Sequence, residues 1–121
     1  MAKHVLIVDD DINIRTAVKL RLERDALIVH TASDGEDALR QVEQQSPDLV
    51  ILDLFLPRRD GIEVLACIKN TAATADIPVI VLTARYHCGD ADAEQLARAN
   101  EVIVKPFSPR YLAERVHHLL N

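Results

Sequence analysis

The chain has 121 residues, of which 49% are hydrophobic and 27% charged, and its formal net charge is −5. This length predicts one domain with its own core, and the negative charge argues against direct nucleic-acid binding, which needs a basic face. No apolar run reaches the roughly 20 residues of a membrane span, and the N-terminus is unlike a signal peptide. Cys67 and Cys88 form no CxxC motif or dense framework, which favours free thiols and a cytoplasmic location.

Short apolar runs rich in β-branched residues recur along the chain. They are nearly continuous rather than alternating, which is typical of strands covered on both faces, as in a parallel sheet. The predicted strands are 4–8, 27–32, 48–53, 78–84 and 101–106.

Helical spacing fills the segments between these runs. In 12–24 the residues Ile14, Ala17, Val18 and Leu22 share one face, and in 34–45 Ala38, Leu39 and Val42 do the same. Start signals precede three helices: a Ser33–Glu36 capping box, the pair Asp60–Glu63, and Ser108-Pro109. The further predicted helices are 62–70, the Ala-rich 90–99, and 109–120.

This alternation of strand and helix predicts an α/β fold, an open and doubly wound parallel sheet. In such sheets the functional site lies beyond the carboxyl ends of the strands. Asp9 and Asp10 follow the first run, Asp53 closes the third, Thr83 closes the fourth and Lys105 the fifth. We therefore expect two or three carboxylates, a hydroxyl and an ammonium group to converge at one edge.

Clustered Asp oxygens without nearby His or Cys suit a hard cation, Mg²⁺ or Mn²⁺. Such a cation, with Lys105 and Thr83, can stabilise the oxygens of a phosphoryl group. Asp53, at the centre of the sheet, is then the natural nucleophile for an aspartyl phosphate. The chain has neither GxxxxGK[ST] nor GxGxxG, so a nucleotide-binding enzyme is not indicated. Asp11 is interpreted as a helix cap rather than a ligand.

Four segments in order carry a family resemblance: LIVDDD, DLVILDLFLPRRDGIEVL, PVIVLTA and VIVKPF. Together they resemble the receiver domain of bacterial two-component response regulators, the CheY-like fold, over essentially the whole chain. KPFSPRYLAERV is closest in character to receivers of the OmpR/PhoB type. The resemblance implies a flavodoxin-like (βα)5 sheet of order 2-1-3-4-5, spanning residues 1–121 as a single domain, either free-standing or the N-terminal part of a longer protein.

The resemblance also assigns roles. Asp53 would accept the phosphoryl group from a sensor histidine kinase or phosphotransfer domain. Asp10, Asp53 and the backbone carbonyl of Phe55 would bind Mg²⁺, and Asp9 would act mainly through a metal-bound water. Thr83 would move toward the phosphate, Lys105 would pair with it, and Lys105-Pro106 would be a cis peptide.

Partners follow from the same resemblance. Phosphorylation would change the 84–111 face and so control an effector domain or downstream protein. An alternative assembly is a homodimer through the 90–120 face with an intersubunit Glu101–Arg115 pair, but Tyr111 and the acidic 90–97 helix depart from the family's dimer pattern and argue against it. The basic run of the first helix, Arg15, Lys19, Arg21 and Arg24, is either a solvated face or a kinase-docking face.

Some residues depart from the family pattern. Val102 stands where many members carry Tyr or Phe. Arg98 replaces a glycine that is common in the family, and Asn100 is expected to adopt the left-handed conformation in place of that glycine. Two other functions stay open: a haloacid-dehalogenase-type phosphatase, which needs an acid where Phe55 stands, and a receiver that only binds partners. His87-Cys88 is a weak candidate for a metal pair.

Overall fold

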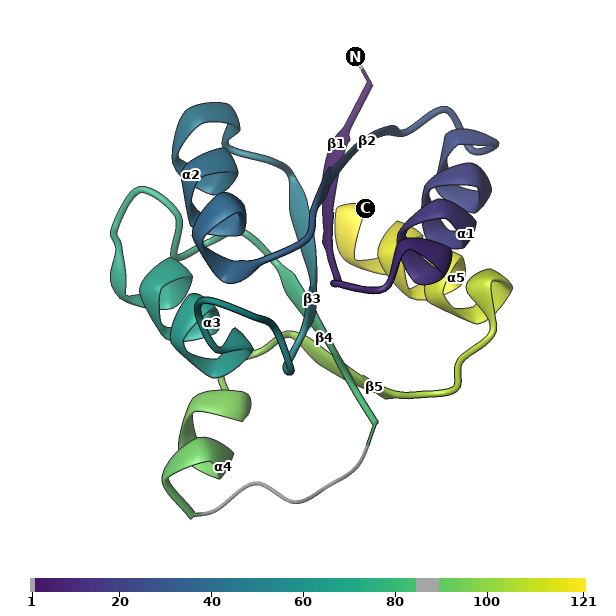
Figure 1. Ribbon diagram of the computed structural model, residues 1–121. Coiled ribbons are helices and arrows are strands. Elements are labelled where there is room, and N and C mark those ends of the chain that lie inside the picture. The colour runs from purple at the N-terminus through teal and green to yellow at the C-terminus, as the bar shows by residue number, and fades with distance from the viewer. Residues whose placement is uncertain (1, 85–89) are drawn as a thin grey trace.

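The computed structural model describes residues 2–84 and 90–121. Strands and helices alternate through the described chain, as Figure 1 shows. In chain order they are β1 (His4–Val8), α1 (Ile12–Glu23), β2 (Ile28–Ala32), α2 (Gly35–Gln45), β3 (Leu49–Asp53), α3 (Gly61–Asn70), β4 (Val79–Thr83), α4 (Asp90–Leu96), β5 (Glu101–Val104) and α5 (Pro109–Leu120).

The strands form one parallel five-stranded sheet of order β2-β1-β3-β4-β5, which confirms the predicted topology. Every residue of β3 and β4 is buried, and only the first residue of β1 is not. Helices on both faces of the sheet explain why these strands read as continuous apolar runs. The predicted ends of the elements differ from the observed ones by no more than a few residues.

Two hydrophobic clusters hold the layers together. One lies under α1 and α5 and includes Val18, Leu22 and Leu112, and the other lies under α2 and α3 and includes Ala38 and Val42. In Figure 1 these helix pairs cover opposite faces of the sheet, and α4 lies below α3. Ala17, predicted on the apolar face of its helix, is instead exposed.

Helix starts are capped by side chains as the sequence predicts in three of four cases. Asp11, Asp60 and Ser108 each accept a hydrogen bond from a backbone N–H of the first turn of α1, α3 and α5. For α2 the predicted Ser33–Glu36 box is wrong, because Asp34 is the N-cap and its Oδ1 accepts from the Asp37 N–H at 2.8 Å. A carboxylate at this position also complements the positive end of the helix dipole.

The prediction of a left-handed Asn100 is also wrong. Positive φ angles among the described non-glycine residues occur at Ala26, Ser46 and Arg58. Asn100 acts through its side chain instead, since Oδ1 accepts from the Val79 N–H at 2.9 Å and from Lys69 Nζ at 3.1 Å. The backbone N–H of Asn100 donates to the Val79 carbonyl at 2.9 Å, so this residue joins the start of β4 to the turn before β5.

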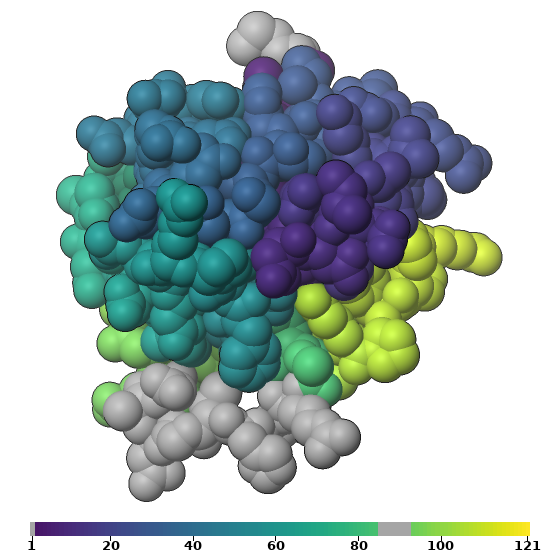
Figure 2. Space-filling model, in the orientation of Figure 1, coloured from purple at the N-terminus to yellow at the C-terminus, as the bar shows by residue number. Residues whose placement is uncertain are grey.

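The loops that follow β1, β3 and β5 meet on one side of the molecule. In the space-filling view of Figure 2 the purple, teal and yellow-green atoms of these segments lie side by side. The site therefore has to be sought where these loops converge.

None of the described helices is long and apolar enough to cross a membrane.

Candidate functional site at the carboxyl ends of the strands

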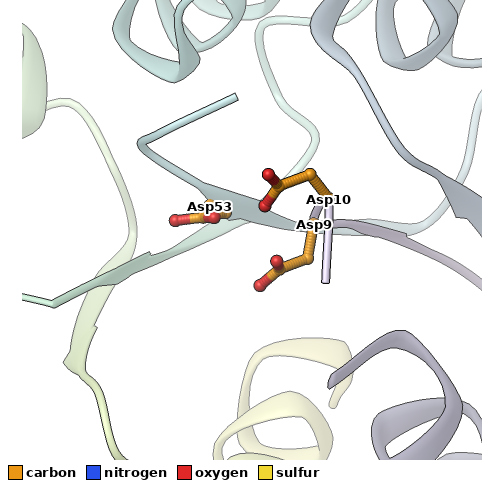
Figure 3. A group of neighbouring side chains, drawn as sticks. All are labelled: Asp9, Asp10 and Asp53. Atoms are coloured by element: carbon orange, nitrogen blue, oxygen red, sulfur yellow. The ribbon is translucent and has the colours of Figure 1, made fainter. Parts of the chain in front are cut away.

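Three carboxylates meet at this edge. Asp9 and Asp10 follow β1, Asp53 ends the adjacent β3, and one oxygen of each lies within 4.8 Å of the others (Figure 3). The register Val8↔Leu52 explains the meeting, because it places the next residue of each strand side by side. Asp9 is 0% and Asp53 4% exposed, whereas Asp10 faces solvent. The structure thus brings together the carboxylates that the sequence singled out.

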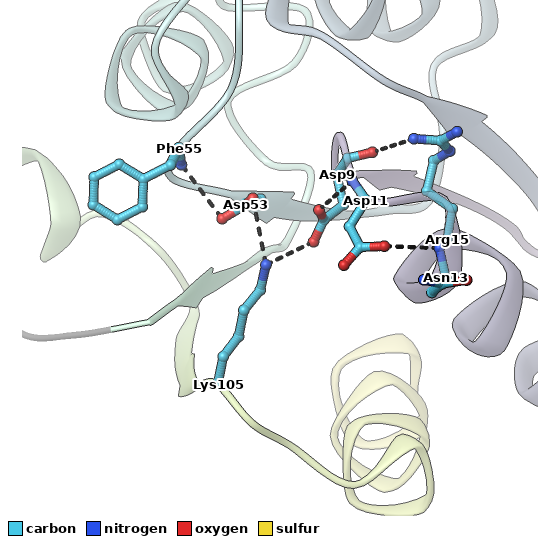
Figure 4. A network of polar contacts seen from close by, with 7 residues as sticks. All are labelled: Asp9, Asp11, Asn13, Arg15, Asp53, Phe55 and Lys105. Carbon is cyan, nitrogen blue, oxygen red and sulfur yellow. Dashed lines mark hydrogen bonds and ion pairs between the residues drawn. The ribbon is translucent and has the colours of Figure 1, made fainter.

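Lys105 supplies the positive charge of the site. Its Nζ lies 2.9 Å from Asp9 Oδ2 and 3.4 Å from Asp53 Oδ2, bridging the two buried acids (Figure 4). The backbone of Lys105 is fixed by donating to the Thr83 carbonyl at 2.7 Å, and the Lys105-Pro106 peptide is cis, as predicted. Burial alone would lower the pKa of Lys105, but the hydrogen bond to Asp9 and the charges of Asp53 and Asp9 raise it overall. The ammonium form is therefore the one present at neutral pH.

Asp53 is an electrostatically strained carboxylate. Burial, followed by the nearby charge of Asp9, raises its pKa from the ordinary 3.8 to about 6. The charge of Lys105 and the Phe55 N–H, which donates to Asp53 Oδ1 at 3.3 Å, oppose this rise without cancelling it. A further cation at this edge would relieve the strain.

The loop after β1 is held by hydrogen bonds to Asp9. Its Oδ1 accepts from the Asp11 N–H at 3.0 Å, and its carbonyl accepts from the Arg15 guanidinium at 2.7 Å. The Asp11 carboxylate turns away to cap α1 by accepting from the Asn13 N–H at 2.8 Å, which confirms its predicted role (Figure 4). Sequence reasoning missed the role of Arg15, because nothing in the helical pattern separates it from its basic neighbours.

Thr83 and Phe55 flank the phosphoacceptor candidate. Thr83 is 1% exposed and ends β4, one residue beyond Leu82, which pairs with Asp53 in the sheet. The Phe55 side chain, by contrast, is 66% exposed beside the cluster. A Cβ at Gly61 would come within 2.4 Å of the Asp53 carbonyl oxygen, so glycine lets α3 begin directly behind the site.

The donor set suits a hard divalent cation. The clustered ligand atoms are all carboxylate oxygens, which Mg²⁺ and Mn²⁺ prefer. Lys105 offsets only part of the charge of three carboxylates. The remaining negative charge matches a divalent ion, so the residues present fit the predicted metal. His87-Cys88, the weaker metal candidate, lies outside the described residues.

Comparison with known proteins decides the family. The profile of the response regulator receiver domain matches residues 5–117, nearly the whole chain. The chain belongs to the response regulator receiver domain family. This confirms the resemblance drawn from the four sequence segments.

Relatives and solved structures agree with this receiver-domain assignment. The chain is 41% identical to the alkaline phosphatase synthesis transcriptional regulatory protein PhoP of Bacillus subtilis, over 100% of the chain and 50% of that protein. It superposes on the chemotaxis response regulator CheY4 of Vibrio cholerae with a TM-score of 0.87 at 28% identity, covering 98% and 99% of the two chains. The Francisella response regulator 1452 receiver domain gives 0.86 at 29% identity, covering 98% and 96%. The chain spans about half the length of the curated relatives it matches.

Proposed function

We propose that Asp53 of this two-component receiver domain accepts a phosphoryl group from the phosphohistidine of a sensor kinase or phosphotransfer domain. The observation that carries the proposal is the placement of the Asp53 carboxylate, buried at a strand end between two further carboxylates and an ammonium group. An Asp53 oxygen would form the new bond to phosphorus as the bond from phosphorus to the histidine nitrogen breaks. The histidine nitrogen released from phosphorus would take up a proton from the partner or from solvent, so that the leaving group is neutral imidazole.

The neighbours of Asp53 have distinct roles in this proposal. Lys105, now paired with Asp9 and Asp53, would pair with a phosphoryl oxygen, and the Thr83 hydroxyl would donate to another. Asp9, Asp10, Asp53 and the Phe55 carbonyl would hold Mg²⁺ or Mn²⁺, with Asp9 acting mainly through a bound water. When bound, this cation offsets the negative charge of the carboxylates and of the incoming phosphoryl group. The domain would thereby promote only its own phosphorylation and dephosphorylation.

The output surface is proposed to be the 84–111 face. Phosphorylation would shift a two-state equilibrium there and so control an effector domain or a downstream protein. Val102 is 36% exposed on β5, with valine in place of the common aromatic. A Val102→Tyr substitution is expected to change the output that follows phosphorylation more than it changes the yield of phosphorylation.

The expected intersubunit Glu101–Arg115 pair is instead formed within one chain. The Arg115 guanidinium donates to both carboxylate oxygens of Glu101, one of them at 2.8 Å, and this tie joins β5 to α5. The pair is therefore already satisfied in the monomer. A homodimer through the 90–120 face would have to use other contacts or exchange this one.

Kinase docking through the basic run of α1 also has less support than the sequence suggests. Arg15 donates to the Asp9 carbonyl, and Arg21 forms an ion pair with Asp25 at 2.7 Å. Half of the run therefore serves the fold of the domain itself. The sensor-kinase partner and the cytoplasmic location both stay predictions.

A small phosphodonor distinguishes the proposed reaction from its rivals. Incubation of the chain with acetyl phosphate and Mg²⁺ should add one phosphoryl group per chain, and omission of Mg²⁺ should strongly reduce the yield. Rapid multiple turnover on phosphate esters would instead favour a phosphatase, for which Phe55 occupies the position of a needed acid. The absence of any adduct would leave only a partner-binding receiver.

A further inference from the structure

Two histidines are hydrogen-bonded to each other across β1 and β2. His4 begins β1, and His30 lies in the edge strand β2, opposite Leu6 in the parallel register (Figure 1). Because side chains alternate along a strand, both imidazoles project from the same face of the sheet as Leu6, the face that α2 covers. The contact therefore joins an edge strand to its inner neighbour, away from the acidic cluster at the carboxyl ends.

The two rings meet head to head. His4 Nδ1 and His30 Nε2 are 3.0 Å apart, and only 8° separates the ring planes. The ring centroids are 5.2 Å apart, as expected for rings that share a plane and point these nitrogens at each other. One ring therefore donates an N–H to the lone pair of the other.

The number of ring protons decides whether this bond can exist. In the neutral pair one lone pair lies at the contact, and the other lies on the outer nitrogen of the donor ring. A first added proton can bind that outer nitrogen, and the hydrogen bond then persists with a charged donor. A second added proton has only the accepting nitrogen at the contact. It would break the bond and set two imidazolium rings against each other, so the pair titrates in two separate steps.

The charged side chains around the pair come from the segment before β1, from α1, from α2 and from the turn before β3: Lys3, Lys19, Asp37, Arg40 and Asp48. Asp37 accepts hydrogen bonds from Arg40 and Gln41 within α2. Asp48 Oδ2 accepts from the His4 backbone N–H at 2.7 Å. Both acids are therefore engaged by other groups.

His30 is the ring that resists protonation. Burial, followed by the positive charges of His4 and Lys19, lowers the pKa of His30 from its ordinary 6.5. The folded state thus holds this proton less tightly than the unfolded chain does. The stabilisation from neutral His30 is complete above the ordinary value and is lost as the pH falls below it.

The two strands are anchored unequally at this end. Asp48 binds the His4 backbone on both sides, because its own N–H also donates to the His4 carbonyl at 2.8 Å. In β2 the Ile28 N–H donates to the Lys3 carbonyl at 2.9 Å, but the Ile28 side chain is 41% exposed. Loss of the histidine bond should therefore loosen β2 rather than β1.

We propose that His4 and His30 form a proton-sensitive clasp between β1 and the edge strand β2, closed near neutral pH and opened when both rings are protonated. Opening would free the amino-terminal end of β2 while Asp48 keeps β1 in the sheet. The effect on stability is opposite in sign to that of Asp53, whose raised pKa makes the folded state more stable as the pH falls. The clasp does not depend on the phosphoryl chemistry of Asp53.

The test follows histidine ring ¹⁵N shifts and amide exchange from about pH 8 to about pH 5, the range in which histidine titrates. We expect the midpoint of His30 to lie below that of the same ring in the urea-unfolded chain, and to rise in His4→Gln. Over this range the protection of the Ile28 N–H, corrected for intrinsic exchange, should fall severalfold relative to that of the Val50 N–H in β3.

Two further variants isolate the clasp. His30→Gln keeps a hydrogen-bonding side chain that cannot be charged, so its relative Ile28 protection should not change with pH. His118→Gln, at an exposed position of α5, should behave as the wild-type chain does. Amide spectra of each variant establish that it is folded. An unchanged His30 midpoint in folded His4→Gln, or relative Ile28 protection that falls equally in wild type and His30→Gln, would overturn the proposal.

Discussion

Lys105 Nζ donates to Asp9 Oδ2 at 2.9 Å across 96 positions of sequence, and it lies 3.4 Å from Asp53. In the absence of a metal ion, this ammonium separates two buried like charges. Lys105→Met should therefore lower the free energy of unfolding in metal-free buffer at neutral pH. The expected loss is on the order of 3 kcal/mol, the usual cost of leaving a buried charge without its partner.

Chemical denaturation measures this loss. Lys3→Met, at an exposed lysine next to β1, is the matched control and should change stability little. Equal effects of the two variants would show that Lys105 does not balance the buried acids.

Asp53→Asn should stabilise the metal-free domain at neutral pH. The pKa of Asp53 is raised from 3.8 to about 6, so the folded state holds this proton more tightly than the unfolded chain does. Stability therefore falls as the pH rises through the interval between these values, and the full cost is present above it. Removing the charge should recover about 3 kcal/mol near neutral pH and progressively less toward pH 3.8.

Urea unfolding at several pH values in the presence of a chelator tests this prediction. Glu23→Gln, which neutralises an exposed acid on α1, should show no such pH-dependent gain. Added Mg²⁺ should raise the thermal midpoint of the wild-type chain more than that of Asp53→Asn, because the variant lacks one of the negative charges that attract the cation. A gain for Asp53→Asn that does not depend on pH would argue against an ionised, strained carboxylate.

Gly61→Ala should disturb the site from behind. The added Cβ would meet the Asp53 carbonyl oxygen at 2.4 Å and the Leu54 Cα at 2.6 Å, and these backbone atoms cannot move aside cheaply. We expect a loss of about 1–3 kcal/mol in the free energy of unfolding, together with a lower phosphorylation yield. Glu63→Ala, on the exposed side of the same helical turn, is the control. Full stability of Gly61→Ala would contradict the close packing of α3 against β3.

Asn100→Ala should destabilise the fold although the residue is exposed. The buried N–H of Val79 would lose its acceptor, and Lys69 Nζ would keep only the carbonyls of Ala75 and Ile77. An unsatisfied buried N–H costs about 1–3 kcal/mol. Asn70→Ala, at the exposed end of α3, is the control, and Asn100→Asp should retain most of the stability because it keeps the acceptor oxygen. Equal stability of the two alanine variants would sink this account.

The residues that the sequence identified correctly share a local or periodic signal. Continuous apolar runs predicted the strands, and a polar residue at each strand end predicted the edge where Asp9, Asp53 and Lys105 meet. Parallel strands align their carboxyl ends, so the convergence of these polar residues follows from elementary geometry. The strand order and the separate ligand roles came from the family resemblance.

The errors concern side chains whose partners are distant in sequence or compete locally. Asn100 reads as a turn residue, and only the fold shows that its amide oxygen lies against Val79 and Lys69. Glu101 and Arg115 read as surface charges available to a partner, yet the packing of α5 on β5 pairs them within the chain. At the start of α2, Ser33 and Asp34 both suit a cap, and pattern alone does not separate neighbours.

The site of phosphorylation tests the central claim most directly. After incubation with acetyl phosphate and Mg²⁺, the acylphosphate is reduced with borohydride and the altered residue is located by peptide mass spectrometry. The account predicts a single modified residue, Asp53, with no adduct in Asp53→Asn and an undiminished one in Asp60→Asn. Modification of Asp9 or Asp10 instead, or an adduct that persists in Asp53→Asn, would contradict it.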